Sequence, residues 1–78
     1  MNPTVKKVEP LTDYKLKILF SNEESKVFDV APFLDKGVFT ELKDHSYFKK
    51  VRVAFGSIEW PNEQDFSKDT LYSLGVSF

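Results

Sequence analysis

Apolar and polar residues alternate along several short stretches of this chain, a pattern typical of half-buried β-strands. The clearest stretch is residues 14–20, where four apolar side chains share one face: Tyr14, Leu16, Ile18 and Phe20. Residues 5–9 predict a strand before it, and residues 26–30 predict a strand after it. Because a polar loop separates the last two strands, residues 14–30 are expected to form an antiparallel hairpin.

A second strand pair is predicted over residues 51–60. Alternation in its first half places three apolar side chains on one inner face: Val51, Val53 and Phe55. Gly56 and Ser57 are expected to form the reversal, because glycine adopts positive φ without a Cβ clash. The returning strand then carries Ile58 and Trp60 on its inner face.

The stretch that follows this pair is expected to be a turn. Pro61 ends the strand because it has no N–H to donate to a ladder. Asn62 and Asp65 are expected to hydrogen-bond their own backbone. Gly56, Ile58, Trp60, Pro61, Asn62 and Asp65 together form the structural motif of the chain. We expect Trp60 to be a core residue, although a lone tryptophan is also a common anchor in protein interfaces.

Residues 31–50 have helical spacing in short pieces. Pro32 suits a helix start, Gly37 suits a helix end, and Asp44 can cap a helix over residues 46–50. A last short helix is predicted over residues 70–74. The pieces are expected to lay their apolar residues over the sheet: Phe33, Leu34, Phe39, Leu42 and Phe48. The fold class predicted is α+β, a small mostly antiparallel sheet with short helices packed on one face.

Composition limits the function classes open to the chain. The 78 residues predict a single domain over 1–78, with a small core that its 15% aromatic content helps to fill. The chain has no cysteine, one histidine and a net charge of −1, with a pI near 5.7. These features predict a soluble, cytoplasmic protein without disulfides or cofactors, and no apolar run is long enough to cross a membrane.

Candidate catalytic and metal-binding groups are few. His45 follows Asp44, but neighbours in sequence face apart on a helix, so we interpret His45 as a solvated residue. A loose acidic group could bind a cation through oxygen ligands: Glu59, Glu63, Asp65 and Asp69. Turn formation and capping account for the same residues without a metal. We therefore expect no catalytic residues, no metal ligands and no enzymatic activity.

Four lysines on neighbouring predicted strands could form a basic strip: Lys6, Lys7, Lys15 and Lys17. Such a strip would attract a phosphate backbone. The alternative is a solvated sheet face whose lysines discourage edge pairing, and this alternative is favoured because no aromatic residues interleave with the lysines. Direct nucleic-acid binding is accordingly not expected.

The C-terminal end is the expected protein contact. The tail over residues 75–78 is apolar and uncharged, so it is expected to pair as an extra edge strand or to fray. Its apolar side chains are expected either to fold back over the core of the chain or to pack on another molecule. The candidate contact residues are Thr70, Leu71, Tyr72, Val76 and Phe78. The expected partner is a second copy of the chain or a small companion protein.

The chain resembles the bacterial domain-of-unknown-function family 2442. The most specific part is the stretch Gly-Ser-Ile-Glu-Trp-Pro-Asn over residues 56–62, followed by Asp65 and by residues 69–72. Further matching stretches lie earlier: residues 28–29, 34–39, 42–44, 48 and 51–53. The position after Asn62 is often glycine in this family and is Glu63 here.

The resemblance implies a small soluble α+β domain and supplies no catalytic residues. Some members carry a helix-turn-helix domain after this one, and others stand beside a gene for a small companion protein, as in toxin–antitoxin pairs. The function predicted is therefore a protein-binding or regulatory module, in its narrower form an antitoxin-like partner. The alternative is a fragment of a nucleic-acid-associated transcriptional regulator.

Overall fold

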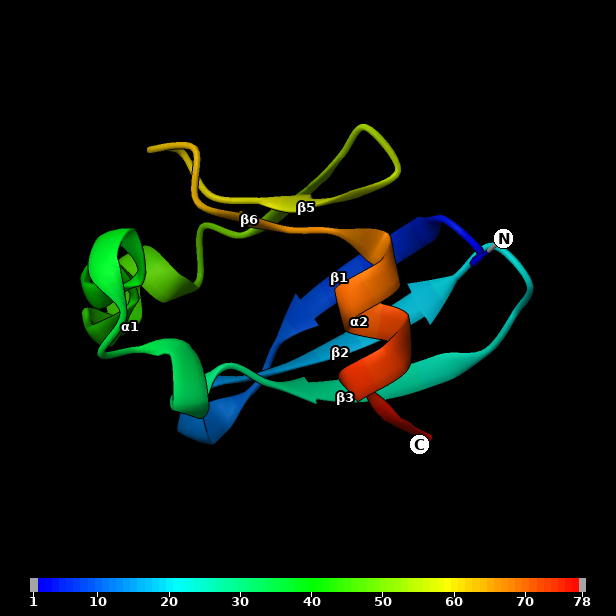
Figure 1. Cartoon of the computed structure of the whole chain (residues 1–78), viewed down its shortest axis with the longest axis horizontal. Coiled ribbons are helices and arrows are strands. Elements are labelled where there is room, and N and C mark those ends of the chain that lie inside the picture. Colours follow the sequence, from blue (N-terminus) through cyan, green and yellow to red (C-terminus); the bar gives the residue numbers. More distant parts are fainter. Residues whose placement is uncertain (1, 78) are drawn as a thin grey trace.

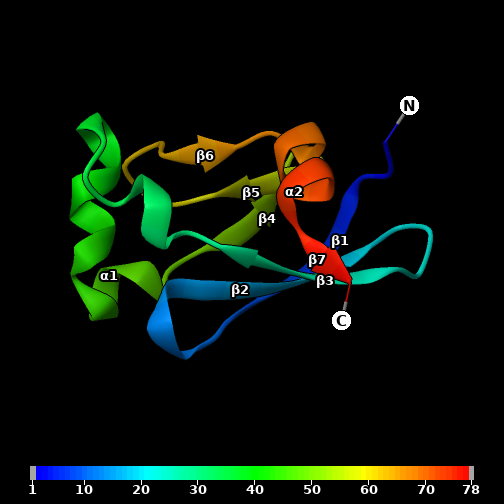
Figure 2. The ribbon, with the colours of Figure 1, turned by 60° about the horizontal axis from the view of Figure 1, so that its bottom comes forward.

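Residues 2–77 are described by a computed structural model, in which two antiparallel sheets face each other (Figures 1 and 2). Sheet A has the strand order β1-β2-β3-β7, with bounds β1 Val5–Pro10, β2 Lys15–Phe20, β3 Ser25–Asp29 and β7 Val76–Ser77. Sheet B has the order β4-β5-β6, with bounds β4 Arg52–Ala54, β5 Ser57–Glu59 and β6 Asp65–Phe66. The α+β class is as expected, but the strands form two sheets where one was predicted.

Alternation along β2 explains how sheet A is oriented. Leu16, Ile18 and Phe20 are fully buried, whereas Lys15 is exposed. The partners of Ile18 are Val8 in β1 and Lys26 in β3, so the predicted hairpin over residues 14–30 is confirmed. The outer face of sheet A is not covered by any element drawn in Figure 2.

The helical segments lie at the two ends of the stacked sheets instead of together on one face (Figure 2). The segments are η1 Thr12–Tyr14, η2 Ala31–Phe33, η3 Gly37–Lys43, α1 His45–Phe48 and α2 Lys68–Leu74. Asp44 caps α1 by accepting from the Ser46 N–H at 3.0 Å, as the sequence predicted. Gly37 begins η3 instead of ending a helix, and its φ of +48° is a conformation that glycine tolerates.

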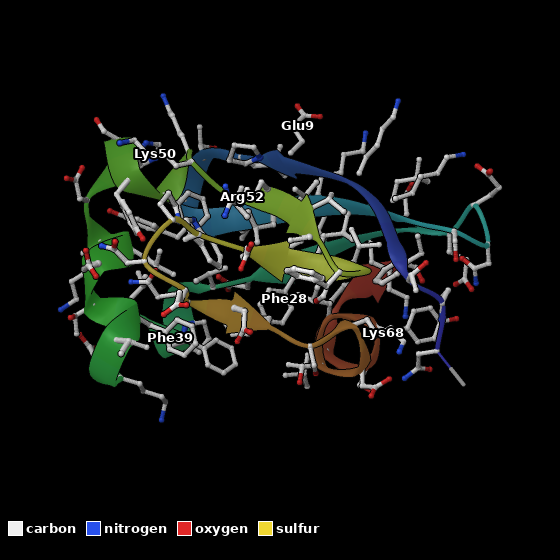
Figure 3. The ribbon with its side chains drawn as sticks, turned by 90° about the horizontal axis from the view of Figure 1, so that it is seen from above. Glu9, Phe28, Phe39, Lys50, Arg52 and Lys68 are labelled. Carbon is white, nitrogen blue, oxygen red and sulfur yellow. The ribbon has the colours of Figure 1, made fainter. Side chains whose placement is uncertain are left out.

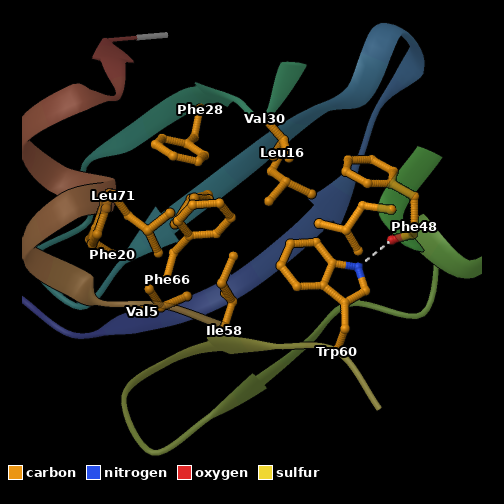
Figure 4. Packing of buried hydrophobic residues seen from close by; sticks show 12 residues of the cluster. Val5, Leu16, Phe20, Phe28, Val30, Phe48, Ile58, Trp60, Phe66 and Leu71 are labelled. Carbon is orange, nitrogen blue, oxygen red and sulfur yellow. Dashed lines mark hydrogen bonds between the residues drawn. The ribbon is translucent and has the colours of Figure 1, made fainter. Parts of the chain in front are cut away.

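A single cluster of apolar side chains fills the space between the sheets (Figure 4). Phe66 of sheet B lies at its centre, with its ring centroid 4.9 Å from that of Phe28 in sheet A. Trp60 is completely buried, and its indole N–H donates to the Phe48 carbonyl at 2.9 Å. The prediction that Trp60 belongs to the core is confirmed.

Val53 and Phe55 were predicted to be buried, and this prediction is wrong. Phe55 is 99% exposed and Val53 is 39% exposed. The turn of the β4–β5 hairpin consists of Phe55 and Gly56, with φ values of 52° and 76°, so Phe55 has left the strand. Strand propensity placed the turn one residue too late, and Val53 lies on β4, an edge strand of sheet B.

The turn after Trp60 is built differently from the expectation. The side-chain amide of Asn62 donates to Glu41 in η3 at 2.8 Å, not to its own backbone. Asp65 is the first residue of β6 and pairs with Glu59, so its assignment to the turn is wrong. Glu63 takes the left-handed position, with φ of 71°, which explains why glycine is suited to this place.

Candidate protein-binding surface

Large apolar side chains are exposed at five positions among residues 2–77: Val38, Val53, Phe55, Leu74 and Val76. Leu74 is 58% exposed at the end of α2, and Val76 is 70% exposed in β7. The two residues are close in sequence and belong to the C-terminal side of the molecule. Exposed apolar side chains on neighbouring residues are a common sign of a contact surface.

Leu74 lies between two open hollows of the surface. One hollow, of about 370 Å³, is lined by Lys15, Val27, Asp29, Leu74, Val76 and Ser77. The other, of about 260 Å³, is lined by Phe28, Asp29, Pro32, Phe33 and Leu74. We call Val27, Pro32, Phe33, Leu74 and Val76 the C-terminal patch, because these residues supply the exposed or partly exposed apolar lining.

The helix α2 determines which of its leucines is exposed. Leu71 points into the core and is fully buried, and Ser67 caps the helix by accepting from the Thr70 N–H at 3.2 Å. Gly75 then closes the helix, with its N–H donating to the Leu71 carbonyl at 2.9 Å. A Cβ at this glycine would lie 2.6 Å from the Leu71 carbonyl oxygen, so a side chain is excluded by space. The closure leaves Leu74 at the surface.

Tyr72 holds α2 against the β2–β3 loop. Its hydroxyl donates to Glu24 at 2.6 Å, and its ring packs edge-on against Phe20. The Lys26 ammonium lies 3.8 Å from the centre of the Tyr72 ring and donates to the Tyr72 carbonyl at 2.7 Å. The hydrogen bond from Tyr72 holds the pKa of Glu24 below its ordinary value, and the same bond raises the pKa of Tyr72.

Of the predicted contact residues, only part can reach a partner. Leu71 is buried, so its assignment as a contact is wrong. Thr70 and Tyr72 are partly buried and hydrogen-bonded within the domain. Val76 is exposed and pairs with Val27 as part of the edge strand β7, so edge pairing, one of the outcomes expected for the tail, is the one observed. Phe78 lies outside the described residues.

Sequence reasoning missed Leu74 as a surface residue. Helical spacing cannot separate Leu71 from Leu74, because residues three apart lie on neighbouring positions of one helix face. Pro32 and Phe33 were assigned to a helix that covers the sheet, with no signal that η2 ends beside α2. Pro32 and Phe33 lie beside Leu74 because of long-range packing, which no local sequence pattern encodes.

The predicted lysine strip is not uniformly basic. Lys6 is ion-paired with Glu23 at 3.1 Å. On the outer face of sheet A, Lys17 is the cross-strand neighbour of Glu9, and Lys15 is that of Asp29. An open hollow of about 440 Å³ on this face is lined by both signs of charge and by apolar groups: Lys7, Val8, Glu9, Lys17, Leu19 and Ser25.

Residues near the Trp60 turn form an internal polar network. The buried Gln64 amide donates to Glu41 at 2.9 Å and to the Val38 carbonyl at 3.1 Å, and Gln64 accepts from the Tyr47 hydroxyl at 2.7 Å. The same hydroxyl accepts from the Asn62 N–H at 2.8 Å. The network joins the turn to η3 and α1, so these polar groups serve the fold.

Other candidate groups are at the surface or apart from one another. His45 is exposed and its ring lies edge-on to Tyr14, with 5.5 Å between ring centroids. Within residues 2–77, no three histidine or carboxylate side chains are grouped so that they could hold a metal ion. In the same part of the chain, no helix has the length and apolar character needed to span a bilayer.

Comparisons with known proteins place the chain among uncharacterised relatives. The profile of a family described as "Protein of unknown function (DUF2442)" matches residues 5–77. A solved structure, the crystal structure of a putative DNA-binding protein from Nitrosomonas europaea ATCC 19718, superposes with a TM-score of 0.81 at 31% identity. The match covers 92% of this chain and 48% of the other, so this chain spans about half of that relative. A comparison with curated proteins found no significant match.

Proposed function

This chain belongs to the DUF2442 family of proteins of unknown function, and we propose that it is a protein-binding regulatory module whose contact surface is the C-terminal patch. The observation that carries the proposal is the exposure of Leu74 and Val76 beside the apolar hollows. Fully burying an aliphatic side chain contributes about 1.5–3 kcal/mol. Two such residues, more than half exposed in the isolated domain, give a partner a source of binding free energy.

The partner in the narrower form of this proposal is a small companion protein. The module binds the companion's active surface and blocks it, as an antitoxin does, and takes no catalytic part itself. Polar groups at the rim of the patch, among them Asp29 and Lys15, would fix the orientation of the partner, since the centre of the patch is apolar.

The test is binding to the product of the gene next to that of this chain. Purified wild-type protein is compared with Leu74→Glu and Val76→Glu by isothermal titration calorimetry. We expect each charge to weaken binding at least tenfold, because a buried unpaired carboxylate is costly. The matched control is Val38→Glu on η3, which is 66% exposed and lines neither hollow.

Circular dichroism melts check that the variants fold, which the exposure of the mutated residues favours. Equal affinity for all four proteins would exclude the patch as the contact surface. If the companion does not bind, sedimentation of the protein alone tests the homodimer, whose dissociation the same two variants would increase.

A second candidate function is nucleic-acid binding, which the likeness to the Nitrosomonas europaea protein favours. Its surface would be the outer face of sheet A, where Lys7 and Lys15 are exposed. A gel-shift series with duplex DNA at increasing salt tests it, since phosphate contacts give affinity that falls steeply with salt. Absence of a shift at low salt would end this candidate and leave the first untouched.

A further inference from the structure

The tip of the β4–β5 hairpin carries an unusual phenylalanine. Phe55 is 99% exposed, the highest value among the exposed large apolar residues of the described chain. Its φ of 52° and that of 76° at Gly56 place both turn residues in the left-handed region. A two-residue hairpin turn of this kind favours Asn, Asp or Gly at its first position, because a bulky side chain is strained there.

Phe55 therefore costs the isolated domain stability in two ways. The backbone conformation is one that phenylalanine rarely adopts, and the ring gains no burial in return. Asparagine would satisfy the turn without either cost. Residues held in a strained conformation at an exposed position are often functional, and a fully exposed aromatic ring is suited to be a binding anchor.

The tip is held firmly by the N-terminal segment. The Gly56 carbonyl accepts from the Val5 N–H at 2.9 Å, and a Cβ at Gly56 would lie 3.0 Å from the Thr4 methyl group. Position 56 thus favours glycine for its φ, and a Cβ there would also press on the Thr4 methyl group. Because the turn is fixed in the isolated domain, presenting Phe55 to a partner loses little conformational entropy.

The chemistry of the tip indicates the partner. Residues 53–58 read Val-Ala-Phe-Gly-Ser-Ile and include no charged side chain. The cation just before them, Arg52, is bound to Glu59 at 3.1 Å across the hairpin. Figure 3 shows Arg52 and Lys50 near the start of β4. A phosphate backbone finds no unpaired cation within this hairpin, whereas an apolar protein pocket requires none.

We propose that Phe55 inserts into an apolar pocket of the partner protein, which makes the hairpin tip a second contact surface besides the C-terminal patch. The inference rests on the proposed function. In Figure 1 the hairpin and the C-terminal end lie on opposite sides of the molecule. The domain extends only 31 × 23 × 18 Å, so one companion protein of ordinary size can reach both sides.

The test uses the full chain, the neighbouring gene product and three variants of the chain. Phe55→Asn removes the ring and relieves the turn, Phe55→Tyr keeps both ring and turn strain, and Val38→Asn is a control at another exposed apolar residue. We expect Phe55→Asn to bind at least tenfold more weakly while its melting temperature rises by about 4 °C. Phe55→Tyr should retain both wild-type values, and Val38→Asn should retain wild-type affinity.

Weaker binding by a more stable protein supports the inference, because a merely structural residue would lower both quantities together. Unchanged affinity for Phe55→Asn overturns the inference and leaves the proposed function standing. A lower melting temperature for Phe55→Asn also overturns it, since Phe55 would then serve the fold. If the wild-type protein does not bind the companion, this inference fails, and the proposed function then depends on the homodimer test by sedimentation.

Discussion

At the scale of single residues, two glutamates have a backbone conformation that glycine adopts with less strain. Glu23 and Glu63 both have φ of 71°. Their loops share a hydrogen-bond pattern. The backbone N–H of Glu23 donates to the Phe20 carbonyl and that of Glu63 to the Trp60 carbonyl, both at 3.0 Å. The pattern is that of a three-residue hairpin loop with a left-handed third position.

We expect Glu63→Gly to stabilise the domain by about 0.5–1 kcal/mol, because the left-handed conformation disfavours side chains with a Cβ. The gain is less than the full conformational cost, since glycine also makes the unfolded chain more flexible. Urea unfolding followed by circular dichroism measures it. Ser73→Gly in the last turn of α2 is the control and should destabilise by about 0.5 kcal/mol. Destabilisation of both variants would contradict the assignment of strain at Glu63.

Trp60 contributes to stability by volume and by a hydrogen bond. It is fully buried and donates to the Phe48 carbonyl at 2.9 Å. Trp60→Ala is expected to cost about 3–5 kcal/mol, because it leaves a large cavity in a small core. The free energy of unfolding from denaturant titration checks this. A loss below about 1 kcal/mol would show that the core collapses around the missing ring.

The contrast between Trp60 and Phe55 shows where residue patterns succeed. Both are aromatic residues in an alternating stretch, and both were predicted to be buried. Trp60 follows a correctly placed strand, whereas Phe55 stands next to a glycine and its strand ended one residue earlier than predicted. Propensity alone cannot find such a position, because a strained aromatic turn residue contradicts local preference.

At the scale of elements, α2 depends on the bond between Tyr72 and Glu24. The hydrogen bond from Tyr72 lowers the pKa of Glu24 from its ordinary value of 4.5 and raises the pKa of Tyr72 from 10.0. A lowered carboxyl pKa contributes stability above the ordinary value, which is lost as the pH falls through the folded-state pKa. A raised phenol pKa contributes stability below 10.0, which is lost as the pH rises through the folded-state pKa.

Tyr72→Phe should therefore lower the melting temperature slightly between about pH 5 and pH 9 and converge on the wild type at both extremes. The ring contacts with Phe20 and Lys26 are kept by the substitution, so the change reports the hydroxyl alone. Melting curves across the pH range, recorded for both proteins, provide the measurement. A difference that stays constant from pH 3 to pH 11 would mean that the Glu24 bond is not its source.

Elements were predictable in proportion to their length. The strand of six residues from Lys15 and the helix cap at Asp44 followed from spacing and side-chain type. β6 has two residues, too few to show a period, and was found only through its partner β5, whereas pairing of the equally short β7 was among the outcomes expected for the tail. For the same reason the division into two sheets, and the contribution of Val27, Pro32 and Phe33 to the C-terminal patch, could not be predicted.

At the scale of the whole molecule, Phe66 joins the two sheets into one folding unit. Its ring lies close to those of four residues from different segments of the chain: Phe28, Phe33, Phe39 and Trp60. The shared core predicts that neither sheet unfolds alone. Trp60 fluorescence, which reports the interior beside sheet B, and far-ultraviolet circular dichroism should give the same urea midpoint.

Phe66→Ala should reduce the free energy of unfolding by about 3–5 kcal/mol and so lower that common midpoint, while the two signals still coincide. Separate midpoints in the variant would show that the sheets have become independent. Asp65→Ala, next to it on the exposed side of β6, is the control and should have little effect.

The short strand β7 has a practical consequence for any search for a partner. Ser77 is paired with Lys26 at the edge of sheet A, directly beside Val76 and Leu74. An affinity tag joined beyond Ser77 would lie close to the patch and compete with a partner for it. Asn2, by contrast, is bound to Asp69 at the start of α2, the opposite end of that helix from Leu74. Pull-down with a C-terminal tag would then miss a genuine companion that an amino-terminal tag, joined through a flexible spacer, would recover.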